Sequence, residues 1–182
     1  MQEKIKATIL TKQDIERVIT RLAHEILEKN RGTENLVLVG LRTRGAHIAE
    51  RISEKIKEIE GSEILTGFLD ATFYRDDFRT RLKQPSVEVS SIPFAIDDKN
   101  IVLIDDVLYT GRTIRAALDA LMDYGRPARI HLVVLVDRGH RELPIKADLV
   151  GKNIPTSVGE EIKVQLTEVD EEDAVYLIEV SQ

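Results

Sequence analysis

The chain has 182 residues, of which 42% are hydrophobic and 32% are charged, so its length and composition predict one folded domain over residues 1–182 and exclude a wholly disordered chain. We expect a cytoplasmic protein with no membrane partner, because no apolar run approaches the roughly 20 residues of a membrane helix and no cysteine is present for disulfides. The net charge of −6 does not exclude nucleic acid as a partner, because residues 159–182 hold eight acidic side chains and one lysine, which leaves the remainder nearly neutral.

The first predicted element is an amphipathic helix. Apolar residues recur at helical spacing from Ile15 to Ile26, and Thr11 with Asp14 is typical of a capping signal, which predicts a helix from about residue 12 to residue 30. The other face of this helix carries several potential cations, Arg21 among them. These charges fit either a solvated surface or a binding surface.

Apolar runs and helical patterns alternate through much of the remaining chain. Such alternation is typical of a parallel sheet that is covered by helices on both faces. We therefore predict the α/β class, with strands at 36–40, 64–69, 100–104 and 130–136 and helices at 46–59 and 113–124.

Two segments lie outside this alternation. Residues 74–98 carry many charges, two prolines and no sustained period, so we expect either a long mobile loop or a hairpin there. After residue 136 the pattern changes to turns and short extended pieces, including 147–150 and 161–166. We expect these pieces to form a small appendage over the carboxyl edge of the sheet.

Residues 101–113, IVLIDDVLYTGRT, are the most informative stretch for chemistry. Here an apolar strand ends in Asp105 and Asp106, and a loop of glycine and hydroxyl residues then opens a helix. Open parallel sheets bind ligands beyond the carboxyl ends of their strands, and a helix N-terminus attracts phosphate. Residues 110–113 suit a phosphate, whereas the two carboxylates suit ribose hydroxyls or a divalent cation. A phosphorylated ribose satisfies both halves of this motif.

Other interpretations of the chain have less support. The phosphate loop of nucleotide-hydrolysing enzymes, the glycine motif for dinucleotides and the nucleophile elbow of hydrolases are absent from the sequence. Four scattered histidines and no cysteine argue against a dedicated transition-metal site. An ordinary capped turn would not explain two adjacent carboxylates at a strand end, because burying them is costly without a role.

Residues 101–113 resemble the signature with which type I phosphoribosyltransferases bind phosphoribosyl pyrophosphate (PRPP). Together with the run RDD at 75–77 and residues 136–157 (VDRGHRELPIKADLVGKNIPTS), they resemble the pyrimidine-operon attenuation regulators of that family, which are also uracil phosphoribosyltransferases. The resemblance covers almost the whole chain. It implies the type I phosphoribosyltransferase fold: a central parallel sheet flanked by helices, with a mobile loop and a small hood over about residues 137–166 plus part of the N-terminus.

The resemblance also implies roles for individual residues. The paired acids contact the ribose hydroxyls and, with PRPP, hold Mg²⁺, while the loop after the first core strand binds pyrophosphate and the hood binds the base. The implied catalytic residues are Asp105, Asp106 and Arg138; the substrate-binding residues are Thr43, Arg44, Tyr109, Thr110, Gly111, Arg112, Thr113, Val136 and Asp137; and the mobile loop contains Arg75, Asp76 and Asp77.

The reaction implied by the resemblance joins uracil to PRPP and yields UMP and pyrophosphate. The alternative is a phosphoribosyltransferase for another base, a purine or orotate, without RNA regulation. Tyr109 stands where the related purine enzymes place an acidic residue, which disfavours a purine substrate.

The same resemblance implies further partners. UMP or UTP would control binding to pyrimidine-operon leader RNA, and the protein would form a homodimer or a larger homo-oligomer. A solvated basic surface is the alternative to RNA binding. The implied RNA-binding residues are Thr20, Arg21, His140, Arg141, Lys146 and Lys152.

Overall fold

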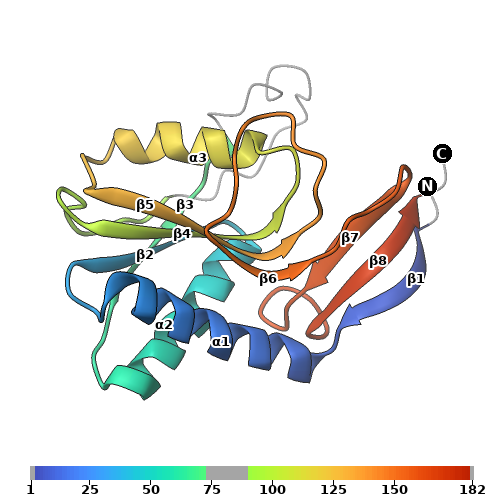
Figure 1. Ribbon diagram of the computed structural model, residues 1–182, viewed down its shortest axis with the longest axis horizontal. Helices are drawn as coiled ribbons and strands as arrows, with labels where there is room; N and C mark the ends of the chain where they lie inside the picture. The colour runs from blue at the N-terminus through green and yellow to red at the C-terminus, as the bar shows by residue number, and fades with distance from the viewer. Residues whose placement is uncertain (1–2, 73–89, 181–182) are drawn as a thin grey trace.

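The computed structural model describes residues 3–72 and 90–180 (Figure 1). The residues expected in the mobile loop, Arg75, Asp76 and Asp77, lie outside the described residues. Within the described part of the chain no helix is long and apolar enough to cross a membrane.

Five parallel strands form the main sheet in the order β3-β2-β4-β5-β6. Strand β4 lies in the middle, so the residues at its carboxyl end lie at the centre of one edge of the sheet. The first four strands match the four predicted from apolar runs, and the fifth arises from a segment expected only as a short extended piece. The strands are β2 (Leu36–Leu41), β3 (Leu65–Leu69), β4 (Asn100–Leu108), β5 (Arg129–Asp137) and β6 (Leu149–Asn153).

Helices cover both faces of this sheet, as Figure 1 shows. Helices α1 (Lys12–Asn30) and α2 (Arg44–Glu60) lie on one face and α3 (Arg112–Met122) lies on the other. Side chains alternate across a strand, so Val102 and Ile104 of β4 pack with α1 and α2, whereas Ile101 and Leu103 pack in the second core cluster with α3. The predicted α/β class with two covered faces is therefore confirmed.

Helix α1 begins as the sequence predicts. The backbone N–H of Thr11 donates to the Asp14 carboxylate (2.9 Å), and the backbone N–H of Asp14 donates to the Thr11 hydroxyl (3.3 Å). This capping box satisfies backbone N–H groups that have no partner inside the helix.

A second, antiparallel sheet forms the hood, in the order β1-β8-β7. Its strands are β1 (Glu3–Leu10), β7 (Glu160–Gln165) and β8 (Ala174–Val180). The expected hood boundaries need correction in two respects: β6 belongs to the main sheet, and the hood extends beyond residue 166 to include β8. The acidic C-terminal region is therefore not a separate tail, because β8 is the central strand of the hood.

Candidate active site

The paired acids lie near the carboxyl end of β4. This strand continues through both acids to Leu108, beyond its expected end at residue 104. Asp105 is only 8% exposed, and its Oδ1 accepts a hydrogen bond from the backbone N–H of Asp106 (2.9 Å). Asp106 is half-buried and accepts from the backbone N–H of Val107 (2.7 Å). Because a buried carboxylate is costly unless it is hydrogen-bonded, these backbone donors explain how an apolar strand can end in two acids.

The loop after β4 leads into helix α3. Gly111 forms the N-cap of the helix with φ of 91°, in the left-handed region that favours glycine, and it supplies no capping side chain. A Cβ on Gly111 would lie 3.3 Å from Cβ of Ile145, so close packing also favours glycine here. The helix thus presents its N-terminal N–H groups, which bind anions, at the same edge of the sheet as the two acids.

Residues 139–146 pack over this loop. The carbonyl oxygen of Thr110 accepts from the backbone N–H groups of Glu142 (2.9 Å) and Leu143 (3.2 Å). The side chain of Arg112 donates through Nε to the Glu142 carboxylate (2.6 Å). Arg112 was expected to add positive charge for a phosphate, and this ion pair, which the sequence did not reveal, offsets part of that charge.

Arg141 connects the covering segment to the loop. Its guanidinium donates to the carbonyl oxygens of Tyr109 (2.8 Å), Ile145 (2.8 Å) and Gly139 (3.3 Å), and it pairs with the Asp137 carboxylate. The sequence predicts an RNA contact for Arg141 and a base contact for Asp137, whereas the structure pairs these two side chains with each other. A ligand contact by either side chain would compete with this pair.

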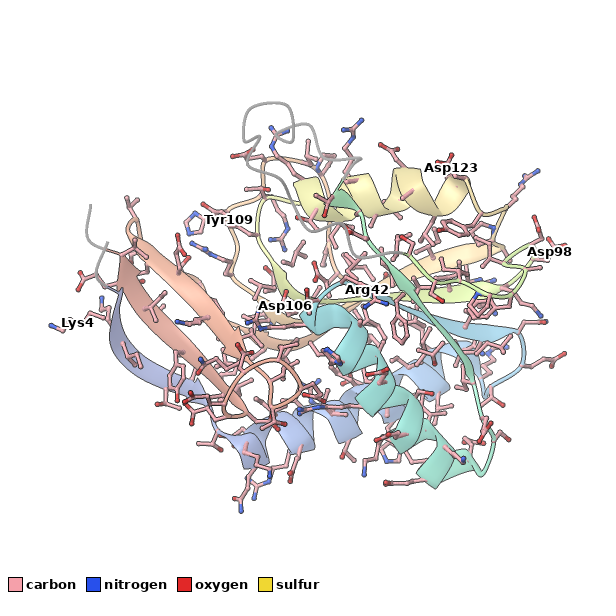
Figure 2. The ribbon with its side chains drawn as sticks, turned by 180° about the vertical axis from the view of Figure 1, so that it is seen from behind. Lys4, Arg42, Asp98, Asp106, Tyr109 and Asp123 are labelled. Atoms are coloured by element: carbon pink, nitrogen blue, oxygen red, sulfur yellow. The ribbon has the colours of Figure 1, made fainter. Side chains whose placement is uncertain are left out.

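The loop between β2 and α2 lies against the end of β4. Gly45, in the first turn of α2, approaches so closely that a Cβ would lie 2.6 Å from the carbonyl oxygen of Ile104 and 3.1 Å from Cα of Asp105. Thr43 is the exposed N-cap of α2, and the peptide bond that precedes it is cis. The loop expected to bind pyrophosphate is therefore adjacent to the paired acids. Figure 2 shows Arg42 of this loop and Asp106 in the central part of the molecule, with Asp98 and Asp123 at one end.

Arg44 is bound to the hood. Its Nε donates to Oδ2 of Asp170 (3.0 Å) and its Nη2 donates to Oδ1 (2.8 Å), which forms a bidentate ion pair. The hydrogen bond from Arg44 holds the pKa of Asp170 below its usual range. The same hydrogen bond raises the pKa of Arg44, to which the nearby charge of Asp106 also contributes. Asp170 is a residue that the sequence reasoning missed.

The predicted base-binding residues lie where β5 meets the hood. Val136 is fully buried, so its side chain is not accessible and only its backbone remains for a base contact. The Arg138 guanidinium lies 3.9 Å from the centre of the Tyr109 ring and donates to the carbonyl oxygen of Glu160 (2.7 Å). Tyr109, Arg138 and His140, together with hood residues, line a cavity of about 220 Å³, whereas Val136 and Asp137 do not.

The predicted RNA-binding residues form two groups. In the first group, Arg21 of α1 donates through Nη2 to the carbonyl oxygen of Gly151 (2.5 Å), which brings α1 beside β6 and its exposed Lys152. Thr20 precedes Arg21 on the same helix, where its hydroxyl donates to the carbonyl oxygen of Glu16 (2.9 Å). The second group is His140, Arg141 and Lys146, in the segment that covers the loop after β4.

The sequence and the fold match those of known proteins. Residues 6–171 match the family model described as phosphoribosyl transferase domain. Among solved structures, the chain is similar to the hypoxanthine phosphoribosyltransferase of Trypanosoma cruzi, with a TM-score of 0.71 at 17% identity over 97% of this chain and 98% of that chain. It is also similar to a hypoxanthine-guanine phosphoribosyltransferase of Bacillus anthracis, with a TM-score of 0.70 at 18% identity over 97% and 99%. At these identities the structural likeness shows the fold alone, which is that of the type I phosphoribosyltransferases.

Relatives with high sequence identity identify a smaller family within the phosphoribosyltransferases. The chain is 57% identical to the bifunctional protein PyrR of Pelotomaculum thermopropionicum over 97% of this chain and 98% of the relative. It is 58% identical to the bifunctional protein PyrR of Bacillus cereus, again over 97% and 98%. The chain therefore belongs to the phosphoribosyltransferase family and, within it, to the family of the bifunctional protein PyrR. This membership confirms the resemblance that the sequence motifs indicated.

Proposed function

We propose that the chain transfers the phosphoribosyl group of PRPP to uracil, and that it also binds pyrimidine-operon leader RNA in response to UMP or UTP to regulate transcription by attenuation. The enzymatic half rests on one arrangement: two carboxylates, a glycine-capped helix N-terminus and the loop of residues 41–45, all at the end of β4. Relatives that are named bifunctional support a second role. We place both roles in the cytoplasm and in a homodimer or larger homo-oligomer.

The residues of the chain would bind and orient PRPP. Asp105 and Asp106 would accept hydrogen bonds from the ribose hydroxyls, while the N-terminus of α3 would bind the 5′-phosphate. Arg44 would donate to the pyrophosphate group, which departs as uracil N1 bonds to ribose C1. Positive groups held in place beside the departing pyrophosphate stabilise the charge that develops on it.

The donor set fits a Mg²⁺ ion that arrives with PRPP. No cluster of three or more histidine, aspartate or glutamate side chains that could hold a metal occurs in residues 3–72 and 90–180. Mg²⁺ is usually bound through one or two carboxylates together with substrate phosphates, and Asp105 with Asp106 provides such a pair. The ion would neutralise charge on the pyrophosphate oxygens.

A comparison of bases tests the enzymatic half. Purified protein with PRPP and Mg²⁺ is assayed for pyrophosphate release with uracil, hypoxanthine, guanine and orotate in parallel. We expect turnover with uracil and little with the other three. Faster turnover with a purine or orotate would instead support the alternative enzyme, and Tyr109 at the position of the purine enzymes' acidic residue argues against a purine.

The RNA-binding half has its clearest support where α1 meets β6. Arg21 and Lys152 come from different elements and are brought together by the contact of Arg21 with the carbonyl oxygen of Gly151. Lys152 and Lys146 are both exposed, as phosphate contacts require. Thr20 and Arg21 also line a groove of about 910 Å³ between α1 and α2, but the basic side chains of that groove are balanced by acidic ones, so the proposal rests on the β6 side of Arg21.

Replacement of Lys146 and Lys152 by alanine tests this half. We expect weaker binding to leader RNA and near-normal uracil turnover, because both side chains are exposed and neither is among the residues proposed to bind PRPP or uracil. The logarithmic salt dependence of binding should fall by about one unit for each phosphate that the variant no longer neutralises. The matched control is Lys57→Ala, which removes an exposed lysine at the far end of α2 and should leave RNA affinity unchanged. If the control variant loses as much RNA affinity as the double variant, the loss does not come from a specific RNA-binding surface. If the double variant loses turnover as well as RNA affinity, the RNA-binding and catalytic sites are not separate.

A further inference from the structure

The hood is joined to helix α2 by a loop that carries acidic side chains. This loop, residues 166–173, connects β7 and β8 and contacts two arginines of α2. Arg44 pairs with Asp170, and Arg51 pairs with Glu168 (2.6 Å) and Asp173 (2.8 Å). Arg51 follows Arg44 by seven positions, about two helical turns, so the two arginines lie on the same face of α2. Both ends of the loop are thereby fixed to the helix that begins at the proposed pyrophosphate loop.

The Asp170 carboxylate is itself well ordered by its surroundings. Its side chain is 15% exposed, and Oδ2 accepts a second hydrogen bond from the backbone N–H of Leu166 (2.8 Å). The backbone N–H of Asp170 donates to the carbonyl oxygen of Leu166 (2.7 Å). A carboxylate held in this way can fix the plane of the guanidinium that it binds.

Arg44 retains hydrogen-bonding capacity beyond this pair. A guanidinium has five N–H donors, and the two bonds to Asp170 use one on Nε and one on Nη2. Nη1 makes no hydrogen bond to any of the described residues, and the side chain is 33% exposed. Asp106 is close enough for its charge to raise the pKa of Arg44, so Arg44 lies between the hood and the acids of β4.

We propose that Asp170 is a positioning residue for PRPP: it orients Arg44 so that the remaining guanidinium donors bind the pyrophosphate group. The proposal rests on the proposed function of the loop at Thr43 and Arg44. Asp170 acts only through Arg44 and does not touch the reacting atoms. The hood thereby contributes to pyrophosphate binding from a loop that is distant in sequence.

Binding of two ligands to the variant Asp170→Asn separates this role from a merely structural one. PRPP carries the pyrophosphate group, whereas UMP carries only the 5′-phosphate, and calorimetry measures each without turnover. We expect the variant to bind PRPP about tenfold more weakly and UMP within about twofold of wild type. In steady-state assays, KM for PRPP should rise by about the same factor, and kcat should fall as well, because Arg44 would no longer be held to stabilise the charge on the departing pyrophosphate.

The matched control is Glu168→Gln, which makes the same carboxylate-to-amide change in the same loop. It breaks a pair with Arg51 but leaves Asp173 to hold that arginine, so PRPP binding should remain at the wild-type level. Rescue by Asp170→Glu, which restores the charge, should recover at least part of the lost PRPP affinity.

Three results would overturn the proposal. Unchanged PRPP affinity in Asp170→Asn would show that Arg44 needs no orientation, and tighter PRPP binding would show that Asp170 competes with the substrate. Equal weakening of PRPP and UMP would show a general distortion of the site. If wild-type protein binds neither ligand, the proposed function itself fails, which is a distinct result.

Discussion

Asp106 is the second of the paired acids that we propose to bind PRPP. It is half-buried at the end of β4, and the backbone N–H of Val107 donates to its carboxylate. We predict that Asp106→Asn lowers kcat/KM for PRPP by roughly a hundredfold or more. Asparagine keeps the shape of the side chain but removes the negative charge that we propose to order the ribose hydroxyls and Mg²⁺. Steady-state assays with uracil check this.

The control for that variant is Asp98→Asn. Asp98 is exposed and has φ of 58°, a conformation that asparagine also tolerates, and Figure 2 shows it far from Asp106. Its replacement should leave both turnover and stability unchanged. Near-normal turnover in Asp106→Asn would remove that residue from the proposed site.

Both backbone conformation and close packing favour glycine at position 111, and comparison with Gly61 distinguishes these two effects. Gly111 combines a positive φ with close packing against Ile145, whereas Gly61 ends α2 at φ of 71° with no atom near its missing Cβ. We predict that Gly111→Ala abolishes the rise in melting temperature that UMP or PRPP gives to wild type, because the anion-binding loop must shift. Gly61→Ala should lower the melting temperature without ligand but keep the ligand-induced rise. A full ligand response in Gly111→Ala would show that the loop is misassigned.

At the scale of elements, the ion pairs between α2 and the loop 166–173 predict a response to acid. Hydrogen bonds from Arg51 hold the pKa values of Glu168 and Asp173 below their usual ranges, and Arg44 does the same for Asp170. A group whose pKa is lower in the folded state contributes stability above its unfolded pKa, and that stability is lost as pH falls through the folded value. We therefore predict a melting temperature that is steady near neutral pH and falls as pH drops below roughly 4.

Asp173→Asn identifies the source of this response. The Asp173 side chain is 4% exposed, so its replacement should lower the melting temperature at neutral pH and flatten the fall at acid pH. The control is Glu58→Gln, at an exposed pair with Lys55, which should change neither quantity much. A profile of Asp173→Asn that parallels wild type would assign the acid response to other groups.

The sequence predicts some elements of this fold better than others. The helices and the first four strands of the main sheet carry strong apolar periodicity, and each is found close to its expected range. Strands β1 and β8 were missed because each is stabilised by pairing with the other, from opposite ends of the chain, rather than by a local pattern. The paired acids and the glycine cap form one continuous motif and were found. The Arg44–Asp170 pair was not, because its partners are separated by 126 positions in sequence.

For the whole molecule, the position of β8 predicts the effect of truncation. Residues 159–182 hold eight acidic side chains and one lysine, and β8 within them pairs with both β1 and β7. We predict that deletion of residues 174–182 unfolds the hood and lowers uracil turnover roughly a hundredfold or more, because the hood then no longer holds Arg44 or encloses the base cavity. Circular dichroism, thermal melting and turnover measure this, with deletion of residues 181–182 alone as the control. Full turnover without β8 would show that catalysis does not need the hood.

The pairing of the first and last strands also sets an order of events during translation. The strands of the main sheet lie within residues 36–153, so all of them are synthesised before Asp170 and β8. Strand β1 is synthesised first, but it cannot pair within the hood until its partner β8 has been synthesised. Because local contacts form before distant ones, we expect the paired acids of β4 to take their places in the main sheet before Arg44 pairs with Asp170. The order of Arg44, on which we propose that pyrophosphate binding depends, is thus set late in folding.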